Sequence, residues 1–408
     1  MTAPELTVGP SEVAAARSAV ADVARHTPVL PSLTLSERAG AEVVLKAENL
    51  QRTGSFKLRG ALNKLAALGE RCARGVTAGS AGNHAWACAQ AARSRGVPCE
   101  VFMPVEAPLS KVEGCRALGA TVHIGGGSVD ECVGRARARA DEAGMAFVHP
   151  FDDPDVIAGQ GTLGLELLED VPDLAKVVVP VGGGGLSSGV AIAVKSARPD
   201  VEVVGVQVDT VAAFPGSLRR GEPTAVEMAL TIADGIAVKR PGELTLPLVR
   251  HWLDDVVTVP EDDVAEAMVL CMEKAKLVVE GAGAVGMAAL LGGQTRGART
   301  GTTAVVLSGG NVDAGLLASV ARRHETEAGR RLVVFTRVPD RPGSLARLLA
   351  LVGETGANLI HVEHLREGID LHVRETAVQL VLETRGREHA DDVLRCLRDA
   401  SYEAETVG

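Results

Sequence analysis

The stretch Gly54-Ser55-Phe56-Lys57-Leu58-Arg59-Gly60 places a lysine where its side chain could do covalent chemistry. It lies between an apolar run at 43–48, typical of a strand, and a run at 58–66 with helical spacing. Ser55 is a good N-cap residue, so Lys57 is predicted to fall in the first helical turn, where the helix dipole disfavours an ammonium ion. A lysine with a lowered pKa can form a Schiff base. From this stretch alone, a solvated surface lysine is the more common case.

A strand followed by four glycines is the second chemical feature. Residues 177–181 run into Gly182-Gly183-Gly184-Gly185-Leu186-Ser187-Ser188-Gly189, and a helix is predicted over 190–197. Backbone without Cβ atoms can approach an anion closely, and a helix N-terminus favours a phosphate. The dinucleotide pattern G-x-G-x-x-G fails because serine replaces its third glycine, and the P-loop pattern fails because Val190 replaces its lysine. The loop therefore predicts a phosphate site, with a merely tight turn as the alternative.

Two further strand-to-helix loops carry polar groups. The loop Gly79-Ser80-Ala81-Gly82-Asn83-His84 could hold a carboxylate at a helix N-terminus, unless Ser80 and Asn83 only cap the helix. Ser308 follows a buried strand at the end where open α/β sheets bind ligands, although it could be a simple turn residue. A Schiff-base lysine, a phosphate site, a carboxylate site and a neutral hydrogen-bonding group are parts that pyridoxal phosphate requires.

The elements that must position these loops alternate along the chain. Short apolar strands are predicted at 75–78, 99–104, 120–124, 146–148, 176–181, 201–206 and 303–307, with helices between most of them. This alternation predicts an α/β fold with a parallel sheet covered on both faces. The earlier and later series could form two lobes with a cleft between them.

A change of pattern near residue 325 predicts a second domain. Residues 332–408 are predicted to follow the order β-α-β-β-α-β, which is a ferredoxin-like arrangement. We therefore predict a catalytic domain at 1–325 with a small lobe at about 53–153, a linker at 326–331 and a C-terminal domain at 332–408.

Composition narrows the function classes. The chain has 408 residues, 46% of them hydrophobic, and a net charge of −10, which argues against non-specific nucleic-acid binding. Its seven cysteines contain no C-x-x-C pair, so we expect reduced thiols in a cytoplasmic protein and no zinc framework. No basic segment followed by an apolar run opens the chain, and no uncharged apolar stretch reaches about 18 residues, so we expect neither a signal peptide nor a membrane partner.

These motifs resemble those of the tryptophan synthase β-like (fold type II) pyridoxal-phosphate enzymes, and are most similar to the threonine ammonia-lyases. The resemblance covers about residues 10–320 and rests on the stretches 46–60, 80–84, 182–186 and 308–311. It implies pyridoxal 5′-phosphate as cofactor, with Lys57 as the Schiff-base residue and the base at Cα. It also implies cofactor contacts from Phe56, Lys57, Asn83, Gly182, Gly183, Gly184, Gly185, Leu186 and Ser308. The substrate carboxylate would bind at Ser80, Ala81, Gly82, Asn83 and His84.

The implied reaction is deamination of L-threonine to 2-oxobutanoate and ammonia, and of L-serine to pyruvate. The segment Glu280-Gly281-Ala282-Gly283-Ala284 matches one that lines the site in this family. The C-terminal domain resembles an ACT domain, which implies a homo-oligomer, an amino-acid effector and a place in isoleucine biosynthesis. The expected effector residues are Asp340, Pro342, Gly343, Ser344 and Asn358.

Three alternatives stay open. Serine racemases, or serine dehydratases, share the scaffold, but Ala81 stands where the racemase pattern has its second base. Gln207 and Ala213 stand where racemases hold a divalent cation, so we expect no metal site. β-Replacement enzymes share the cofactor machinery and usually lack an ACT domain. The non-enzyme alternative is an amino-acid sensor with an inactive catalytic lobe, and the complete set of site motifs argues against it.

Overall fold

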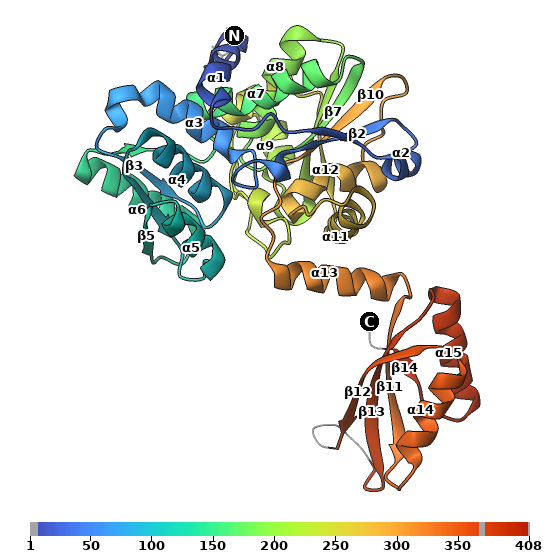
Figure 1. Ribbon diagram of the computed structural model, residues 1–408. Coiled ribbons are helices and arrows are strands. Elements are labelled where there is room, and N and C mark those ends of the chain that lie inside the picture. The colour runs from blue at the N-terminus through green and yellow to red at the C-terminus, as the bar shows by residue number, and fades with distance from the viewer. Residues whose placement is uncertain (1–6, 367–371, 407–408) are drawn as a thin grey trace. The chain divides into compact units, whose positions relative to one another are not determined.

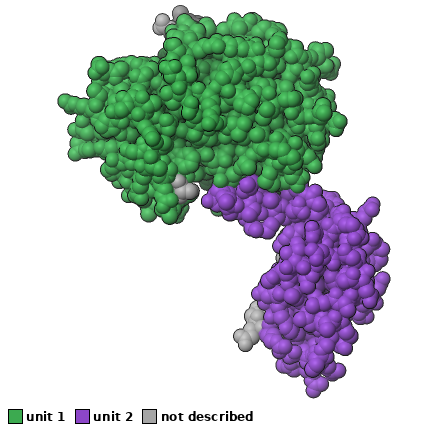
Figure 2. All heavy atoms as spheres, in the orientation of Figure 1, with its two compact units in different colours: residues 1–312 green, residues 313–408 purple. Residues whose placement is uncertain are grey.

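The protein consists of two compact units. The computed structural model describes residues 7–366 and 372–406. Unit 1 falls within Met1–Val312 and unit 2 within Asp313–Gly408 (Figure 2). Helix α13 (Ala314–Glu327) belongs to unit 2 and extends past residue 325, where we placed the end of the catalytic domain. The domain boundaries that the sequence predicts, at 1–325, 326–331 and 332–408, remain predictions.

The larger sheet of unit 1 has six strands in the spatial order β1-β2-β10-β7-β8-β9. β2, β10, β7, β8 and β9 are parallel, whereas β1 runs antiparallel to β2 at one edge. Their bounds are β1 (Val29–Pro31), β2 (Val43–Ala47), β7 (Leu174–Pro180), β8 (Glu202–Val208), β9 (Asp255–Val259) and β10 (Thr302–Leu307). The parallel α/β core confirms the predicted fold class, and the antiparallel edge strand is an addition to it.

Helices cover both faces of this sheet (Figure 1). On one face, α7 (Pro154–Asp170) and α8 (Gly185–Ala197) pack on Val177 and Val179 of β7. On the other face, α12 (Gly281–Leu291) packs on Val178, where a Cβ built on Gly286 would lie 3.5 Å from the valine side chain. Since successive side chains of a strand point to opposite faces, a continuous valine run suits a strand buried on both. The remaining helices of unit 1 are α1 (Pro10–Ala21), α2 (Leu33–Ala39), α3 (Lys57–Leu68), α4 (Asn83–Arg95), α5 (Leu109–Ala117), α6 (Val129–Ala143), α9 (Ala213–Arg220), α10 (Thr245–Trp252) and α11 (Glu261–Leu270).

The smaller sheet of unit 1 is entirely parallel, in the order β5-β4-β3-β6. Its strands are β3 (Val76–Gly79), β4 (Cys99–Met103), β5 (Thr121–Ile124) and β6 (Ala146–Phe147). In sequence it is inserted between β2 and β7 of the larger sheet. The protein therefore has two parallel sheets in unit 1, each with its own apolar core.

Glycines let α3, α7 and α8 approach closely. A Cβ built on Gly159 of α7 would lie 2.7 Å from the Arg59 carbonyl oxygen of α3. A Cβ on Gly189 of α8 would lie 2.4 Å from the Ile157 carbonyl oxygen of α7. Separations this short exclude any side chain, so these glycines fix how near α3 and α8 lie to the helix between them.

A buried ion cluster joins the start of α3 to the larger sheet. The Arg59 guanidinium is fully buried and donates to Glu48 Oε1 at 2.7 Å and to Glu166 Oε1 at 2.6 Å. Lys46 Nζ, also fully buried, lies 2.7 Å from Glu166 Oε2 and 3.1 Å from Asp170 Oδ2. Burial alone would raise the pKa of Glu48, but the Arg59 charge and its hydrogen bonds lower it. The cluster therefore holds the Glu48 carboxylate ionised in the interior.

Unit 2 has the ferredoxin-like arrangement that the sequence predicts. Its four strands form an antiparallel sheet in the order β12-β13-β11-β14, and α14 (Ser344–Glu354) and α15 (Arg387–Asp399) share its apolar core. The strands are β11 (Arg331–Pro339), β12 (Asn358–Leu365), β13 (Glu375–Glu383) and β14 (Glu405–Thr406).

All seven cysteines are free thiols, and each of them except Cys396 is buried. Within residues 7–366 and 372–406, no helix is both long and apolar enough to cross a membrane.

The ion cluster yields a stability prediction. Arg59→Ala leaves Glu48 and Glu166 buried without their cation, so we expect a loss of about 3–5 kcal/mol in the free energy of unfolding. Urea unfolding followed by circular dichroism measures it. Arg17→Ala is the matched control, because Arg17 pairs with Glu169 at the exposed surface and should cost less than about 1 kcal/mol. Equal losses in the two variants would contradict a special contribution from the cluster.

Candidate functional site

One cavity of about 660 Å³ gathers every residue that the sequence assigns to catalysis, cofactor and substrate. Lys57 enters it from the start of α3, residues 80–84 from the β3–α4 loop, residues 182–186 from the β7–α8 loop, and Ser308 from the end of β10. The loops at the carboxyl ends of parallel strands meet at one edge of a sheet, which is where α/β folds bind ligands. The two sheets of unit 1 thus bring these four segments together, and their individual roles stay predictions.

The Lys57 side chain is partly buried in the wall of the cavity, and its amine reaches a backbone oxygen. Nζ donates to the Pro150 carbonyl oxygen at 2.8 Å and lies 5.2 Å from the centroid of the Phe56 ring. Burial lowers the pKa of Lys57 to about 8, although Cys88 and Glu280 act in the opposite direction. A much larger share of this amine than of an ordinary lysine is therefore uncharged near neutral pH, and the uncharged form is the one that a nucleophile requires.

The predicted cap of α3 is wrong. The N-cap residue is Phe56, and the buried Ser55 hydroxyl has no hydrogen-bond partner among the residues that the structure describes. Ser55 instead forms a β-bridge with Gly309, and Phe56 N donates to the Ser308 carbonyl oxygen at 3.1 Å. Long-range backbone pairing therefore sets the start of α3, and it links Lys57 directly to the Ser308 segment.

The 80–84 loop is organised by Asn83. Asn83 is the first residue of α4 rather than its cap, because Gly82 occupies the N-cap position. Asn83 Nδ2 donates to Glu280 Oε1 at 2.7 Å, and Asn83 Oδ1 accepts from Asn311 Nδ2 at 2.7 Å. Ser80 Oγ accepts from Gly82 N at 3.1 Å.

His84 is neutral in this site. Its Nε2 lies 2.9 Å from the Val148 carbonyl oxygen, and burial, together with the Lys57 charge, lowers its pKa to about 3. An uncharged ring tied to a backbone carbonyl is a structural element of the loop, and within the loop it is the helix N-terminus that attracts a carboxylate.

The glycine loop is a cradle at the start of α8. Gly184 has a φ of +93° and is the N-cap residue. A Cβ built on Gly183 would lie 2.3 Å from the Phe151 ring, so only glycine fits at this position. Thr245 Oγ1 donates to the Gly183 carbonyl oxygen at 2.6 Å. The first N–H groups of a helix have no intrahelical partner, so this loop can offer them to an anion.

Ser308 is buried at the end of β10, and its hydroxyl donates weakly, at 3.4 Å, to the Ala282 carbonyl oxygen. Its environment offers a neutral hydroxyl to the cavity. Sequence reasoning missed other lining groups, above all the Pro150 carbonyl oxygen, since a backbone atom leaves no signal in residue type. It placed Glu280 in a segment that lines the site, which the structure bears out, but gave this residue no specific role.

The predicted effector residues of unit 2 divide into two places. Asp340, Pro342, Gly343 and Ser344 follow β11, where the Asp340 carboxylate accepts two hydrogen bonds from Arg366, each 3.0 Å. Asn358 begins β12, and its register partner Glu383 pairs with Arg331 at the opposite end of β11. The structure therefore does not bring Asn358 together with the other four residues within this unit.

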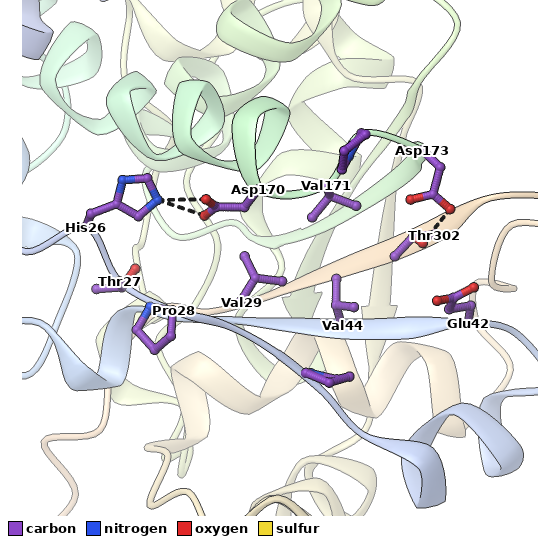
Figure 3. Close-up of a pocket in the computed structure, with 12 residues that line it drawn as sticks. His26, Thr27, Pro28, Val29, Glu42, Val44, Asp170, Val171, Asp173 and Thr302 are labelled. Carbon is purple, nitrogen blue, oxygen red and sulfur yellow. Dashed lines mark hydrogen bonds and ion pairs between the residues drawn. The ribbon is translucent and has the colours of Figure 1, made fainter.

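A second cavity of about 450 Å³ opens on unit 1, and no predicted site residue lines it. Figure 3 shows the His26 ring directed at the Asp170 carboxylate, with His26 Nε2 2.8 Å from Asp170 Oδ1. Thr302 Oγ1 donates to Asp173 Oδ2 at 2.9 Å. These lining groups already have partners within the protein, and Asp170 belongs to the ion cluster described above.

No group of three or more His, Cys, Asp or Glu side chains that could hold a metal ion occurs in the described part of the chain. At the position that we compared with the racemase cation site, the buried Gln207 side chain bonds to the backbone, donating to Val181 O at 3.1 Å and accepting from Phe214 N at 2.9 Å.

The lowered pKa of Lys57 can be measured directly. Competitive acylation of the cofactor-free protein with acetic anhydride, read by mass spectrometry, should modify Lys57 half-maximally near pH 8. Lys64 is the matched control on the same helix: burial lowers its pKa, but Asp153 and Asp155 outweigh burial and raise it above the ordinary value. Half-modification of both lysines above about pH 10 would contradict a depressed pKa at Lys57.

Comparison with known proteins identifies two family segments. The model of the family described as "Pyridoxal-phosphate dependent enzyme" matches residues 20–309, and that of the "ACT domain" matches residues 332–400. The L-threonine ammonia-lyase of Thermotoga maritima is 46% identical over 399 residues, which cover 97% of this chain and 99% of that protein.

Two solved structures resemble most of this chain. The T.th. threonine deaminase shares 41% identity with a TM-score of 0.70, over 75% of this chain and 99% of that one. Maize serine racemase shares 34% identity with a TM-score of 0.74, over 79% of this chain and 99% of that one. Given these matches and the cavity around Lys57, this chain belongs to the family of pyridoxal-phosphate dependent enzymes and carries a C-terminal ACT domain.

Proposed function

We propose that the protein is a threonine ammonia-lyase that converts L-threonine to 2-oxobutanoate and ammonia, and L-serine to pyruvate. The observation that carries the proposal is the Lys57 amine, whose pKa burial lowers to about 8, facing two helix N-termini across one cavity. The similarity to the Thermotoga maritima L-threonine ammonia-lyase, which extends through both segments of the chain, supports this substrate.

The residues of the cavity fit pyridoxal phosphate. The residues 182–186 at the start of α8 suit its phosphate, because Gly183 and Gly185 leave the backbone open and a Cβ at either would meet Phe151 within 3 Å. Ser308 suits the ring nitrogen, and Phe56 and Asn83 line the same space. When bound, the cofactor supplies an electron sink for the charge that develops at the substrate Cα.

In this mechanism, Lys57 accepts and later releases the proton of the substrate Cα. Lys57 would be the residue that holds the cofactor, and its amine would be the group that accepts the proton from the substrate Cα. The hydrogen bond to the Pro150 carbonyl oxygen fixes where the amine sits. A lysine with a pKa of about 8 can accept a proton near neutral pH and release it again before the next turnover.

The 80–84 loop orients the substrate. The N-terminus of α4 attracts the substrate carboxylate, and the loop places no other titratable side chain than neutral His84 beside it. Ala81 carries a methyl group, which can neither donate nor accept a proton. This residue favours elimination over racemisation, even though the fold is also that of maize serine racemase.

The ACT segment supports regulation by an amino acid. We propose the loop after β11 as the effector site, with Asp340, Pro342, Gly343 and Ser344 as contacts, and Asn358 as a separate contact at the other end of the sheet. We also propose that the protein forms a homodimer or homotetramer. Its proposed role is in isoleucine biosynthesis.

Lys57→Ala tests the catalytic assignment. The variant lacks both the nucleophile and the base, so 2-oxobutanoate formation from L-threonine should fall by at least about 10³-fold. Lys274→Ala is the matched control, since Lys274 lies at the surface with 43% of its side chain exposed. A Lys57→Ala variant that retains activity would refute the assignment, and a wild-type protein without oxo-acid formation would favour β-replacement or sensing.

Asp340→Ala tests the effector site. If isoleucine suppresses and valine restores 2-oxobutanoate formation, the variant should require roughly tenfold to a hundredfold more effector, because it loses a charged hydrogen-bonding group. Basal turnover should be unchanged. Asp392→Ala, which removes an exposed carboxylate paired with Arg395, is the control. An unaltered effector response in Asp340→Ala would place the effector elsewhere.

A further inference from the structure

Glu280 is a buried acid that the proposed mechanism does not use. Its side chain lines the cavity directly before α12, and the residue is 6% exposed. Acidic side chains are seldom buried without a partner, because removing a carboxylate from water is costly. The partners of Glu280 therefore indicate what it does.

The Asn83 side chain is fixed between two groups of opposite hydrogen-bonding character. Glu280 Oε1 accepts from Asn83 Nδ2 at 2.7 Å, and Asn311 Nδ2 donates to Asn83 Oδ1 at 2.7 Å. Asn311 is itself anchored, since its Nδ2 also donates to the Thr53 carbonyl oxygen at 2.8 Å. If the Asn83 amide were rotated by 180°, its oxygen would face the Glu280 carboxylate and its NH₂ group would face the Asn311 NH₂ group. Only one orientation of the amide therefore satisfies both neighbours.

This arrangement leaves one donor of Asn83 for a ligand. A side-chain amide nitrogen carries two N–H groups, and within residues 7–366 and 372–406 only Glu280 accepts from Asn83 Nδ2. We propose that Glu280 is a positioning residue, which holds the Asn83 amide so that its second N–H group meets the bound pyridoxal phosphate. The proposal deepens the proposed function and rests on it.

The position of the Glu280 carboxylate is itself determined by the loop after β10. Glu280 N donates to the Gly309 carbonyl oxygen at 3.1 Å, and a Cβ built on Gly309 would lie 2.2 Å from Glu280 Oε1. Only glycine at this position leaves room for the carboxylate. Gly309 also follows Ser308, so one short segment places both the Ser308 hydroxyl and the group that orients Asn83.

The charges around Glu280 make the interaction depend on pH. Burial and Asp234 raise the pKa of Glu280 to about 7, against the lowering effects of the Asn83 hydrogen bond, Lys111 and the Asn311 backbone N–H. Glu280 thus changes from mostly neutral to mostly ionised as the pH rises through about 7. Hydrogen bonds to an ionised acceptor are stronger, so its hold on Asn83 should tighten as the pH rises. Its negative charge also raises the pKa of Lys57.

Cofactor affinity of the full-length protein tests the proposal. Apo-protein is titrated with pyridoxal phosphate at pH 6 and pH 8.5, and binding is followed by equilibrium dialysis and by the visible absorbance of the bound cofactor. Glu280→Gln keeps an acceptor oxygen but cannot ionise. We expect near wild-type affinity at pH 6 and roughly tenfold weaker binding at pH 8.5. Glu280→Ala should bind roughly tenfold to a hundredfold more weakly at pH 8.5, where wild type holds the carboxylate.

Two further variants separate positioning from general damage. Gly309→Ala displaces the carboxylate without changing its charge, so it should weaken cofactor binding as Glu280→Ala does. Glu142→Gln removes a carboxylate that is 75% exposed and should bind as wild type does at both pH values. Circular dichroism establishes that each variant is folded.

The outcomes distinguish the two proposals. In one outcome, wild-type protein binds pyridoxal phosphate, and the Glu280→Gln and Glu280→Ala variants bind it equally well at both pH values. This result overturns the role of Glu280 and leaves the proposed function in place. A loss that is identical at pH 6 and pH 8.5 in Glu280→Gln also overturns it, because a merely structural residue would behave in that way. Wild-type protein that fails to bind pyridoxal phosphate overturns the proposed function as well.

Discussion

The buried Arg59 ion cluster is the constraint on which the site depends. Arg59 and Lys57 lie two residues apart on α3, and at about 100° per residue their side chains leave the helix on nearly opposite sides. The guanidinium is fixed between Glu48 and Glu166, so the amine must project the other way, into the cavity. Since one carboxylate precedes α3 and the other belongs to α7, the cluster fixes both the position of α3 and its rotation about its own axis.

The close approach of the helices helps the Arg59 ion cluster to fix the position of α3. Gly159 and Gly189 allow α3, α7 and α8 to approach with no side chain between them, so little movement of α3 relative to α8 is possible. The distance from the Lys57 amine to the glycine cradle at the start of α8 is therefore set by backbone packing. Lys57 can react with a small molecule whose phosphate binds at the glycine loop only if the distance between the amine and the loop is fixed.

Local sequence patterns predicted the parts of this site, and long-range contacts decided how they meet. The sequence could predict three parts of the site, because each follows a strand-like run and has residue types that are uncommon there: Lys57, the 182–186 loop and Ser308. The Ser55 cap was wrong because backbone pairing with Gly309 overrides a local preference. Strand β9 was missed although three of its five residues are valine, and it is a partly exposed strand at the edge of the sheet. Glu280 could be located from sequence, but its hydrogen bond to Asn83 spans 197 residues and has no local signature.

Burial acts on Lys57 and Glu280 in opposite directions and brings their proton affinities together. It disfavours the charged form of each, so the pKa of the amine falls to about 8 and that of the carboxyl rises to about 7. Near neutral pH both groups can change protonation at little cost, whereas in water they would lie about six pH units apart. Because each charge also stabilises the other, loss of the proton from Lys57 is easier when Glu280 is neutral. The cavity therefore couples the group that orients Asn83 to the group that takes the proton, through charge alone and without a direct contact between them.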